Sequence, residues 1–466
     1  MRKKTHRTAG KITTFTIVSL SLFCCAGRCS ADIFHVSKTG SDIAGDGSSG
    51  APWATPKHGC ARIGGGDTLV IHEGTYSNAD VRNIVFSASG NVENPIIVTS
   101  AEDEGIPILD AEYANDEDAY GPIFNISGRD YIILDRLDLR NGGGHTRGNV
   151  TIGSDSASHH VTVQNCRISS ISRGGETWTT NNPAQIWIGQ GGGTHDIIIR
   201  NNEIFGDNMG EGSGIKIQNV YNLTIENNEF HNLQSGIANK YGNSASLGHI
   251  YRNNFFHECG GNTRGSIWSG SPGTVISNNL IINGIGATGI EIANAEEYDE
   301  GTYPVIMHNT VYGCGDSGIY LHASSVGSVT GARVFDNVVV NSAGNHGREY
   351  SINLYGEGLP DESDHNCFYN QSNQNVISHS SGTYSLNAWK AANNPFDQNS
   401  INVLPTFANI SGNMNIVADF EITGGLANNS ASDNGDMGAD VSLVGINAGQ
   451  PSDAVSPASP TGLSVS

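Results

Sequence analysis

Short stretches of alternating apolar and polar residues recur along most of the chain. Two of them are "LTIENNEF" (residues 223–230) and "SGIKIQ" (residues 213–218). Strict alternation over about four to eight residues places one set of side chains in a core and the other set outside it, as in a half-buried β-strand. Glycine and asparagine, which favour turns, separate the stretches. The pattern predicts an all-β chain of short strands joined by many turns.

One of these patterns returns with an asparagine near its middle and apolar residues on both sides. Successive copies are 25–36 residues apart. They are centred on Arg136, Asn165, Asn201, Asn227, Asn253, Asn278, Asn309, Asn337 and Asn366. An asparagine tolerates left-handed backbone geometry better than most residues. We therefore expect Asn227 and its equivalents to stand at tight turns, and their amides to bond to one another from coil to coil.

A second strand pattern lies between these copies, as in "AQIWIG", "SGIANK", "TGIEIA" and "SGIYLH". Repeats of about 25–30 residues, each with two or three short strands, describe a solenoid of about ten β coils stacked at ~4.8 Å. A leucine-rich repeat would need helical segments, and a propeller would need blades of ~40 residues. A β-solenoid is therefore the predicted fold.

The first 31 residues have the form of an export signal. "MRKKTHRTAGK" is basic, "ITTFTIVSLSLFCCA" is apolar, and "CSA" before Asp32 offers small residues for cleavage. This pattern predicts a signal peptide at 1–31 and a secreted or periplasmic protein of a bacterial envelope. No later segment is long and apolar enough for a membrane span. Five cysteines follow the signal, and we expect most of them to be buried, with one disulfide conceivable.

The charge of the chain limits its partners. The formal net charge of −22 becomes −28 once the six basic residues of 1–31 are removed. Such a surface argues against nucleic acid as a partner. An acidic polymer would bind only through a local cationic site or through bridging metal ions, of which calcium is the expected candidate.

Three segments carry a resemblance to a known family: residues 34–76, residues 94–111, and "SDHNCFYN" with the stretch up to residue 409. Together they resemble the right-handed parallel β-helix proteins of the pectate-lyase-like superfamily, especially secreted bacterial polysaccharide lyases of families six and nine. The resemblance implies an N-terminal cap with the first strands at 32–93 and a right-handed parallel β-helix with a C-terminal closure at 94–445. Residues 446–466 form a Pro- and Ser-rich linker or tail, and the protein is expected to be a monomer.

The resemblance is more specific for fold than for activity. The Asp-Pro-His-Asp sequence of mannuronan epimerases is absent, and so is the Asn-Thr-Asp, Asp-Asp and Gly-His-Gly set of polygalacturonases. The acidic cluster with a lysine that characterises family nine is not evident. Family six pairs a lysine and an arginine on adjacent coils. Lys240 and Arg264 lie about one coil apart, but Arg264 precedes its strand, so their registration is poor.

The second strand pattern predicts one functional face. If its isoleucines point inward, the residues between them point outward and stack along one line. This outward set is Trp187, Lys216, Gln218, Lys240, Trp268, Glu291, Tyr320, His322, Asn353 and Tyr355. Aromatic rings suit the apolar faces of sugars, while lysines and amides suit hydroxyls and carboxylates. We expect a glycan-binding groove here, and the alternative is an ordinary solvated sheet face.

β-Elimination on a uronic acid needs a base for the C5 proton, an acid for the leaving oxygen and neutralisation of the carboxylate. Lys240 is the predicted base. Lys216 or Arg264 could neutralise charge, and Tyr320 or His322 could be the acid. The remaining members of the outward set are predicted to contact the substrate.

Calcium could also neutralise the substrate. The acidic loop "NAEEYDE" (residues 294–300) follows the "GIEIA" strand and offers Glu296, Glu297 and Asp299 as ligands. A solvated loop is the alternative interpretation of this segment.

The predicted function is that of a secreted polysaccharide lyase acting on uronic-acid-containing glycans of the alginate or pectin type. Two alternatives remain open: a non-catalytic glycan-binding or surface protein, and a glycoside hydrolase or uronan epimerase on the same fold. The hydrolase would use Glu291 with a second carboxylate. The fold cannot decide among them, because function belongs to the site.

Overall fold

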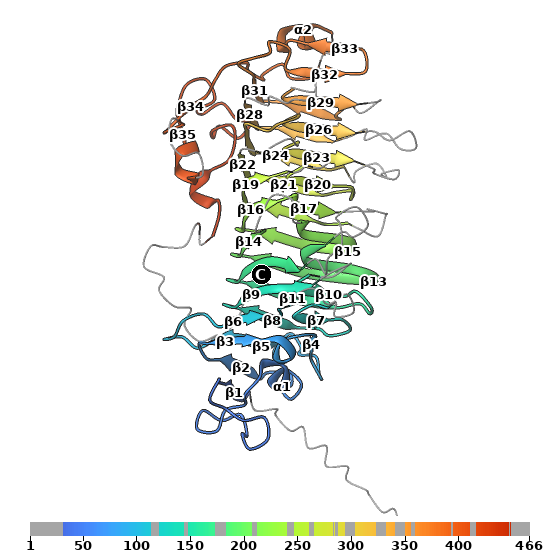
Figure 1. Cartoon of the computed structure of the whole chain (residues 1–466). Helices are drawn as coiled ribbons and strands as arrows, with labels where there is room; N and C mark the ends of the chain where they lie inside the picture. The colour runs from blue at the N-terminus through green and yellow to red at the C-terminus, as the bar shows by residue number, and fades with distance from the viewer. Residues whose placement is uncertain are drawn as a thin grey trace, which may run out of the picture.

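The computed structural model describes residues 31–112, 121–143, 148–172, 183–206, 212–239, 247–260, 265–282, 284, 288–293, 303–322, 332–340, 350–355, 359–392, 395–410, 416–446 and 448. The chain winds into a tall column of short parallel strands, with the first strands at one end and the last ones at the other (Figure 1). Every strand pair of this column is parallel except the pair β32–β33 at its C-terminal end. The predicted solenoid of β coils is confirmed.

Each coil contributes strands to three stacks. Stack 1 runs through β4 (Ile84–Val85), β7 (Phe124–Ile126), β10 (Val150–Ile152), the first part of β13 (Ala184–Arg200) and of β15 (Ser213–Glu226), β17 (Ser235–Asn239), β20 (Ile267–Ser269), β23 (Ile290–Ala293), β26 (Ile319–His322), β29 (Ile352–Tyr355) and β32 (Ile377–His379). Stack 2 runs through β1 (Ile33–Val36), β2 (Thr68–Ile71), β5 (Ile96–Ser100), β8 (Ile132–Asp135), β11 (His159–Gln164), the last part of β13 and β15, β18 (Ile250–Arg252), β21 (Val275–Ser277), β24 (Val305–Met307), β27 (Arg333–Phe335) and β30 (Glu362–Asp364).

Stack 3 is a separate 11-stranded sheet. It runs through β3 (Thr75–Ser77), β6 (Ile108–Asp110), β9 (Asp138–Gly143), β12 (Arg167–Ser172), β14 (Glu203–Phe205), β16 (Glu229–Leu233), β19 (Phe255–Cys259), β22 (Leu280–Ile282), β25 (Thr310–Tyr312), β28 (Val338–Val340) and β31 (Cys367–Tyr369). Stacks 1 and 2 form one sheet because β13 and β15 pass through both, with a register shift between Gly189 and Thr194.

One continuous apolar core fills the column. The isoleucines of stack 1 point into it and are at most 2% exposed: Ile186, Ile215, Ile237, Ile267, Ile290, Ile319 and Ile352. Each fully buried isoleucine contributes about 1.5–3 kcal/mol relative to an exposed one. No coil could bury these side chains alone, so the stacking itself stabilises the strands.

The asparagine repeat divides into two columns, which corrects the sequence interpretation. Asn227 has the expected left-handed backbone (φ 56°), as do Asn165, Asn201, Asn253 and Asn278. The buried amide ladder, however, is formed by the residue that comes directly after the left-handed one. These ladder residues are Asn202, Asn228, Asn254, Asn279, Asn309, Asn337 and Asn366, all 0% exposed. In the last three coils His308, Asp336 and His365 take the left-handed position, and the repeat asparagines Asn309, Asn337 and Asn366 bond from coil to coil as predicted.

The two roles fall on successive residues because neighbouring side chains at the corner point to opposite sides. The Nδ2 of Asn228 donates to Oδ1 of Asn254 at 3.0 Å, and the same oxygen accepts the backbone N–H of Asn228 at 3.1 Å. Each buried amide is therefore satisfied by the next coil. Asn227 points away from the core, and its Nδ2 donates to the carbonyl of Leu443 at 2.9 Å.

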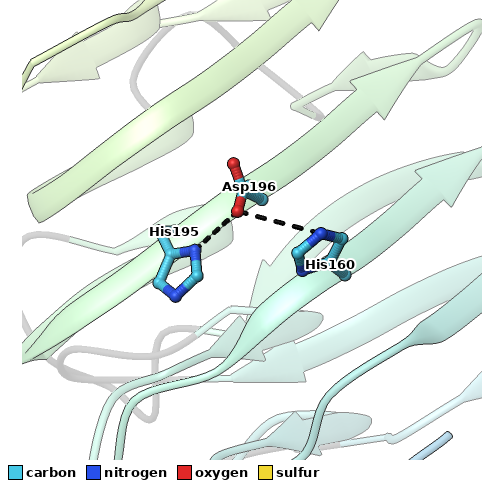
Figure 2. Close-up of side chains that lie close together, drawn as sticks. All are labelled: His160, His195 and Asp196. Atoms are coloured by element: carbon cyan, nitrogen blue, oxygen red, sulfur yellow. Dashed lines mark hydrogen bonds and ion pairs between the residues drawn. The ribbon is translucent and has the colours of Figure 1, made fainter. Parts of the chain in front are cut away.

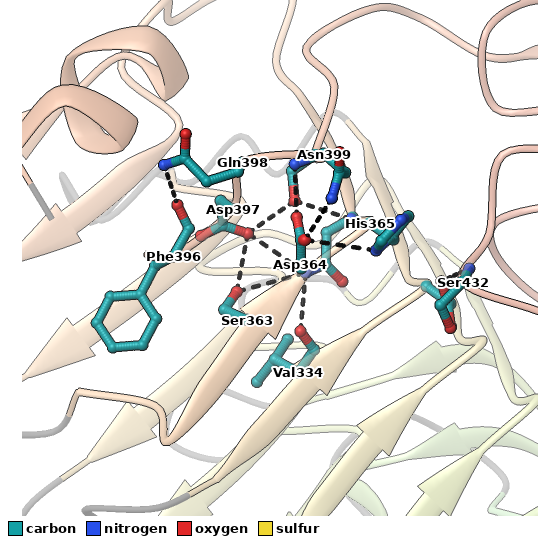
Figure 3. A network of polar contacts seen from close by, with 12 residues as sticks. Val334, Ser363, Asp364, His365, Phe396, Asp397, Gln398, Asn399 and Ser432 are labelled. Atoms are coloured by element: carbon teal, nitrogen blue, oxygen red, sulfur yellow. Dashed lines mark hydrogen bonds and ion pairs between the residues drawn. The ribbon is translucent and has the colours of Figure 1, made fainter. Parts of the chain in front are cut away.

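A buried carboxylate closes the C-terminal end of the amide ladder (Figure 3). Asp397 Oδ1 accepts the hydroxyls of Ser363 and Ser400 at 2.8 Å, and its Oδ2 accepts the indole N–H of Trp389 at 3.0 Å. Asn366 Nδ2 lies 3.4 Å from the same Oδ1. Burial raises the pKa of Asp397, while these hydrogen bonds act in the opposite direction. The predicted C-terminal closure thus has a polar centre.

The ends of the column are covered differently. Near the N-terminus, α1 (Pro56–Cys60) starts after Thr55, whose side-chain oxygen accepts the N–H of His58, and it buries Cys60. At the other end lie β33 (Gly382–Tyr384) and α2 (Leu386–Ala392), which buries Trp389. All five described cysteines are free and buried, as mostly expected, and no disulfide joins them.

The chain then returns along the outside of stack 3 (Figure 1). We call residues 403–410 and 416–446 the C-terminal segment. It contains β34 (Thr406–Phe407) and β35 (Ile422–Gly424), and its apolar residues cluster with Phe255, Leu280, Tyr312 and Val338 of stack 3. It reaches the middle of the column, where the N–H of Gly445 donates to the carbonyl of Asn253 at 2.9 Å.

Candidate functional site

One line of residues crosses stack 1 on the face opposite to the buried isoleucines. The strand registers place these residues side by side, one from each coil, and we call them the stack 1 row. The row is Asn125, Thr151, Trp187, Lys216, Ala238, Trp268, Glu291, Tyr320 and Asn353. It contains six of the ten residues that the sequence pattern assigned to one face.

The N-terminal part of the row is buried. Trp187, Lys216 and Trp268 are 3%, 6% and 4% exposed. The ammonium nitrogen of Lys216 lies 5.4 Å from the centre of the Trp187 ring, a cation–π contact. Three neighbouring members also hold a buried polar atom that has no hydrogen-bond partner within the described part of the chain: Asn125 Oδ1, Thr151 Oγ1 and Trp187 Nε1. Such atoms are rare in folded proteins and call for a functional or structural explanation.

The surface beside the C-terminal part of the row, on the same strands, is more open. Tyr355 is 54% exposed, and Tyr320 and His322 are partly exposed. Their rings contact one another, with centroids 5.5 Å apart for Tyr320 and His322, and 5.1 Å apart for His322 and Tyr355. We call these three residues the aromatic trio. It presents ring faces, hydroxyls and an imidazole at one place on stack 1.

The polar members beside the trio are held by hydrogen bonds. Glu291, in register with Tyr320, accepts the N–H of Gly265 through Oε2 at 3.2 Å. Asn353 is 6% exposed, and its Nδ2 donates to Ser317 Oγ at 3.3 Å. Gln218 is partly exposed and lies beside Gly189 in the register.

Several predicted site residues lie outside the described residues. They are Lys240, Arg264, Glu296, Glu297 and Asp299. The row position between Lys216 and Trp268, where the sequence interpretation placed Lys240, is occupied by Ala238. The reason is strand parity: Ile237 points inward, so the residue that follows it lies in the row.

A second group, which the sequence interpretation missed, lies where stack 1 passes into stack 2. Figure 2 shows His160, His195 and Asp196 with their polar atoms turned toward one another. Their possible ligand atoms all lie within 4.8 Å of each other. A signal was present in the sequence, because His160 and Asp196 each precede the repeat asparagine of their coil by five residues.

A third group on stack 3 meets the same distance criterion: Glu229, His231 and His257. Both groups could hold a metal ion through imidazole nitrogens and a carboxylate. Burial lowers the pKa of His160, and the nearby Asp196 carboxylate acts against that shift.

Residues 186–401 match the family described as "Right handed beta helix region". This match gives the coil its hand, and the predicted right-handed parallel β-helix is confirmed. No curated protein matches the chain. None of the described helices has the length and apolar character that a membrane crossing requires.

Solved structures that are similar to this chain include the following three. Pectate lyase Pel9A is 17% identical, with 69% of this chain and 79% of that one covered and a TM-score of 0.48. A mannuronic acid specific polysaccharide family 6 lyase from human gut microbiota is 15% identical, with 75% and 82% covered and a TM-score of 0.47. The PL6 family polysaccharide lyase Pedsa3628 from Pseudopedobacter saltans is 13% identical, with 83% and 96% covered and a TM-score of 0.47. These values leave reaction and substrate to be argued from this chain's own residues.

Proposed function

We propose that this protein is an exported polysaccharide lyase that cleaves uronic-acid-containing glycans by β-elimination. The observation that carries the proposal is the stack 1 row, in which consecutive coils place aromatic rings, a cation, a carboxylate and an amide along one line. A row that repeats at the strand spacing of ~4.8 Å suits a long, linear ligand better than a compact one.

The open end of the row is the proposed place of substrate contact. The aromatic trio offers apolar ring faces next to polar groups, which is the combination that aromatic side chains bring to binding surfaces. Tyr320 and His322 are near enough to each other for one bound sugar to meet both. We assign the general acid to one of these two residues.

The base and the neutralising groups complete the proposal. Lys240 remains the proposed base. Lys216 is buried against Trp187, so we assign it a long-range electrostatic role, which is stronger in a medium of low dielectric constant. Direct neutralisation of the substrate carboxylate falls to Arg264, or to calcium held by Glu296, Glu297 and Asp299.

The test is to mix the full chain with alginate, pectate and other uronans, with calcium or with a chelator, and to follow the ultraviolet absorbance of unsaturated products. Lys240→Ala and a Tyr320→Phe/His322→Ala double variant should each lower the rate about 10²–10⁴-fold if base and acid are lost. Tyr369→Phe, on stack 3, is the matched control and should keep the rate. Full lyase activity in the Lys240→Ala variant would exclude Lys240 as the base.

A non-catalytic glycan-binding protein is the second candidate, and one observation favours it. Trp187, Lys216 and Trp268 are buried, so the ammonium group of the row does not reach a bound glycan. The exposed aromatic trio still offers ring faces for contact. In that case the uronans bind without any product, and Tyr355→Ala weakens the binding. A hydrolase would instead release reducing ends without absorbance, and Glu291→Gln would abolish that release.

A further inference from the structure

We propose that His160, His195 and Asp196 form a binding site for a divalent transition-metal ion, with zinc as the ion of first choice. This metal site is separate from the stack 1 row and does not rest on the proposed lyase activity. It is built by two coils whose strands β11 and β13 lie side by side, with His159 and His195 in register.

The three side chains already converge (Figure 2). Asp196 Oδ2 lies 2.7 Å from His195 Nδ1 and 3.8 Å from His160 Nε2. The side chains of His160, His195 and Asp196 are 42%, 25% and 34% exposed, so an ion in solution can reach them. Small rotations would bring the three atoms to the ~2.0–2.2 Å that zinc requires.

The contacts around His160 are compatible with the tautomer that a metal needs. His160 Nδ1 lies 2.9 Å from His159 Nδ1, and His159 Nε2 lies 3.5 Å from Asp130 Oδ2. A neutral His159 that directs its Nε2–H toward Asp130 accepts at Nδ1. His160 then donates from Nδ1 and keeps its Nε2 lone pair. A carboxylate–histidine chain that orients a metal-binding histidine is a common feature of metal sites.

That tautomer creates a conflict which a cation resolves. His160 Nε2 and Asp196 Oδ2 then both present lone pairs to each other at 3.8 Å. A proton on His160 could relieve this, and so could a metal ion. Asp196 is itself oriented, because its Oδ1 accepts the amide of Asn222 at 3.0 Å. Its Oδ2 faces both imidazoles and would exchange its 2.7 Å contact with His195 Nδ1 for the ion.

The backbone at the site follows the geometry of the corner between stack 1 and stack 2. His160 and Asp196 both have left-handed backbone conformations, with φ of 54°. The equivalent position in a later coil is Gly248, which adopts such a φ without a steric cost. Tyr131 and Asn222 are left-handed at the same position of their coils, so this geometry is a property of the corner and is not specific to the metal site.

The ligand set selects the class of metal. Two imidazoles and one carboxylate suit zinc and its first-row neighbours, whereas calcium and magnesium prefer oxygen ligands alone. Three protein ligands leave a coordination position for water or for an anionic group of a partner molecule.

The group on stack 3 is the alternative metal site, and it differs in its hydrogen bonds and in its exposure. His257 Nε2 lies 3.0 Å from Glu229 Oε1, and His231 Nε2 lies 3.2 Å from Glu203 Oε1. Each imidazole therefore has its own carboxylate partner, and no two lone pairs oppose each other. His257 is also only 8% exposed. This group provides the matched control.

The experiment uses the full chain, purified without a polyhistidine tag and stripped with a chelator. Zinc sulfate is titrated by calorimetry at neutral pH in two buffers of different ionisation enthalpy. We expect one equivalent of zinc, bound through Nδ1 of His195 after the proton of that nitrogen moves to Nε2 of the same ring. His160→Ala and Asp196→Asn should abolish this binding, His159→Ala should weaken it about 10–100-fold, and His257→Ala should leave it unchanged.

Four results would overturn the proposal. They are no zinc binding by the stripped protein, equal binding by His160→Ala and wild type, loss of binding in His257→Ala instead, and tighter binding of calcium than of zinc. Circular dichroism of each variant shows whether the fold is retained. Lyase activity is measured separately, so that failure of the metal site and failure of the proposed function remain distinguishable.

Discussion

The outer face of stack 3 is built in two ways along its length. In the first half most outward residues are polar: Arg167 lies in register with Glu203, and His231 with His257. In the second half the same strand positions are apolar, as in Leu280 and Val338, and the C-terminal segment covers them. The change occurs within β19, which carries both Phe255 and His257.

The strands themselves do not differ between the halves. Both halves have parallel pairing in continuous register, buried inward residues and the same amide ladder. The outer face is thus independent of the coil that carries it. The polarity of the outward side chains decides whether that part of the column contacts water or the C-terminal segment.

The largest effect on this comparison is expected from Phe420→Ala. Phe420 is 0% exposed and packs against Tyr312 and Phe407, with ring centroids 5.4 and 5.6 Å away. Its truncation should lower the free energy of unfolding by about 3–5 kcal/mol, or detach the C-terminal segment. Denaturant unfolding and limited proteolysis measure the two outcomes. Leu426→Ala, at a 62% exposed position of the same segment, should change stability by less than about 0.5 kcal/mol. If both variants unfold at the same free energy, the packing of the C-terminal segment on stack 3 contributes nothing to stability.

An intermediate effect, equal in both halves, is expected from breaking the ladder. Asn202→Ala lies under the polar half and Asn309→Ala under the covered half, and both side chains are 0% exposed. Each truncation leaves buried hydrogen-bonding groups unsatisfied and should cost about 1–3 kcal/mol. Asn201→Gly, at the left-handed position beside Asn202, is the control and should be nearly neutral. A much larger cost in one half would show that the halves differ in more than their outer face.

The smallest effect is expected in the polar half, and it should depend on pH. The hydrogen bond from His231 lowers the pKa of Glu203, burial opposes the shift, and Arg167 adds to it. Because the folded pKa lies below the ordinary value of 4.5, this stabilisation is present at neutral pH and is lost as the pH falls through the lowered pKa. Glu203→Gln should therefore cost up to about 1 kcal/mol at neutral pH and little in acid. Unfolding measured across this range checks the slope, with Glu362→Gln, a 54% exposed partner of Arg333, as the control. Identical slopes in Glu203→Gln and wild type would exclude this ion pair as a source of acid sensitivity.

Period-two alternation was sufficient to predict much of the row. Trp187 and Lys216 could be placed on one line because their neighbouring isoleucines point inward. The same rule shows why Ala238, and not Lys240, fills the next place. In coils with paired asparagines, such as "ENNEF", the ladder was assigned to the wrong member of the pair, since both fit either role and only the corner geometry separates them.

The group of His160, His195 and Asp196 shows the limit of prediction from sequence patterns. His160 and Asp196 are 36 residues apart in the sequence, and only the register of β11 with β13 brings their coils together. The C-terminal segment illustrates the same point, because the bond from Asn227 to Leu443 joins residues that no local pattern connects.

The sequence by itself determined the strands, their inward residues and the repeat that stacks them, because these depend on local alternation and spacing. Tertiary structure decided which outward residues meet. Because the coils differ in length, the sequence spacing between residues that lie side by side on neighbouring coils varies. The row on stack 1, the histidine–aspartate group and the docking of the C-terminal segment all depend on the register between coils. That register is defined only in the folded solenoid.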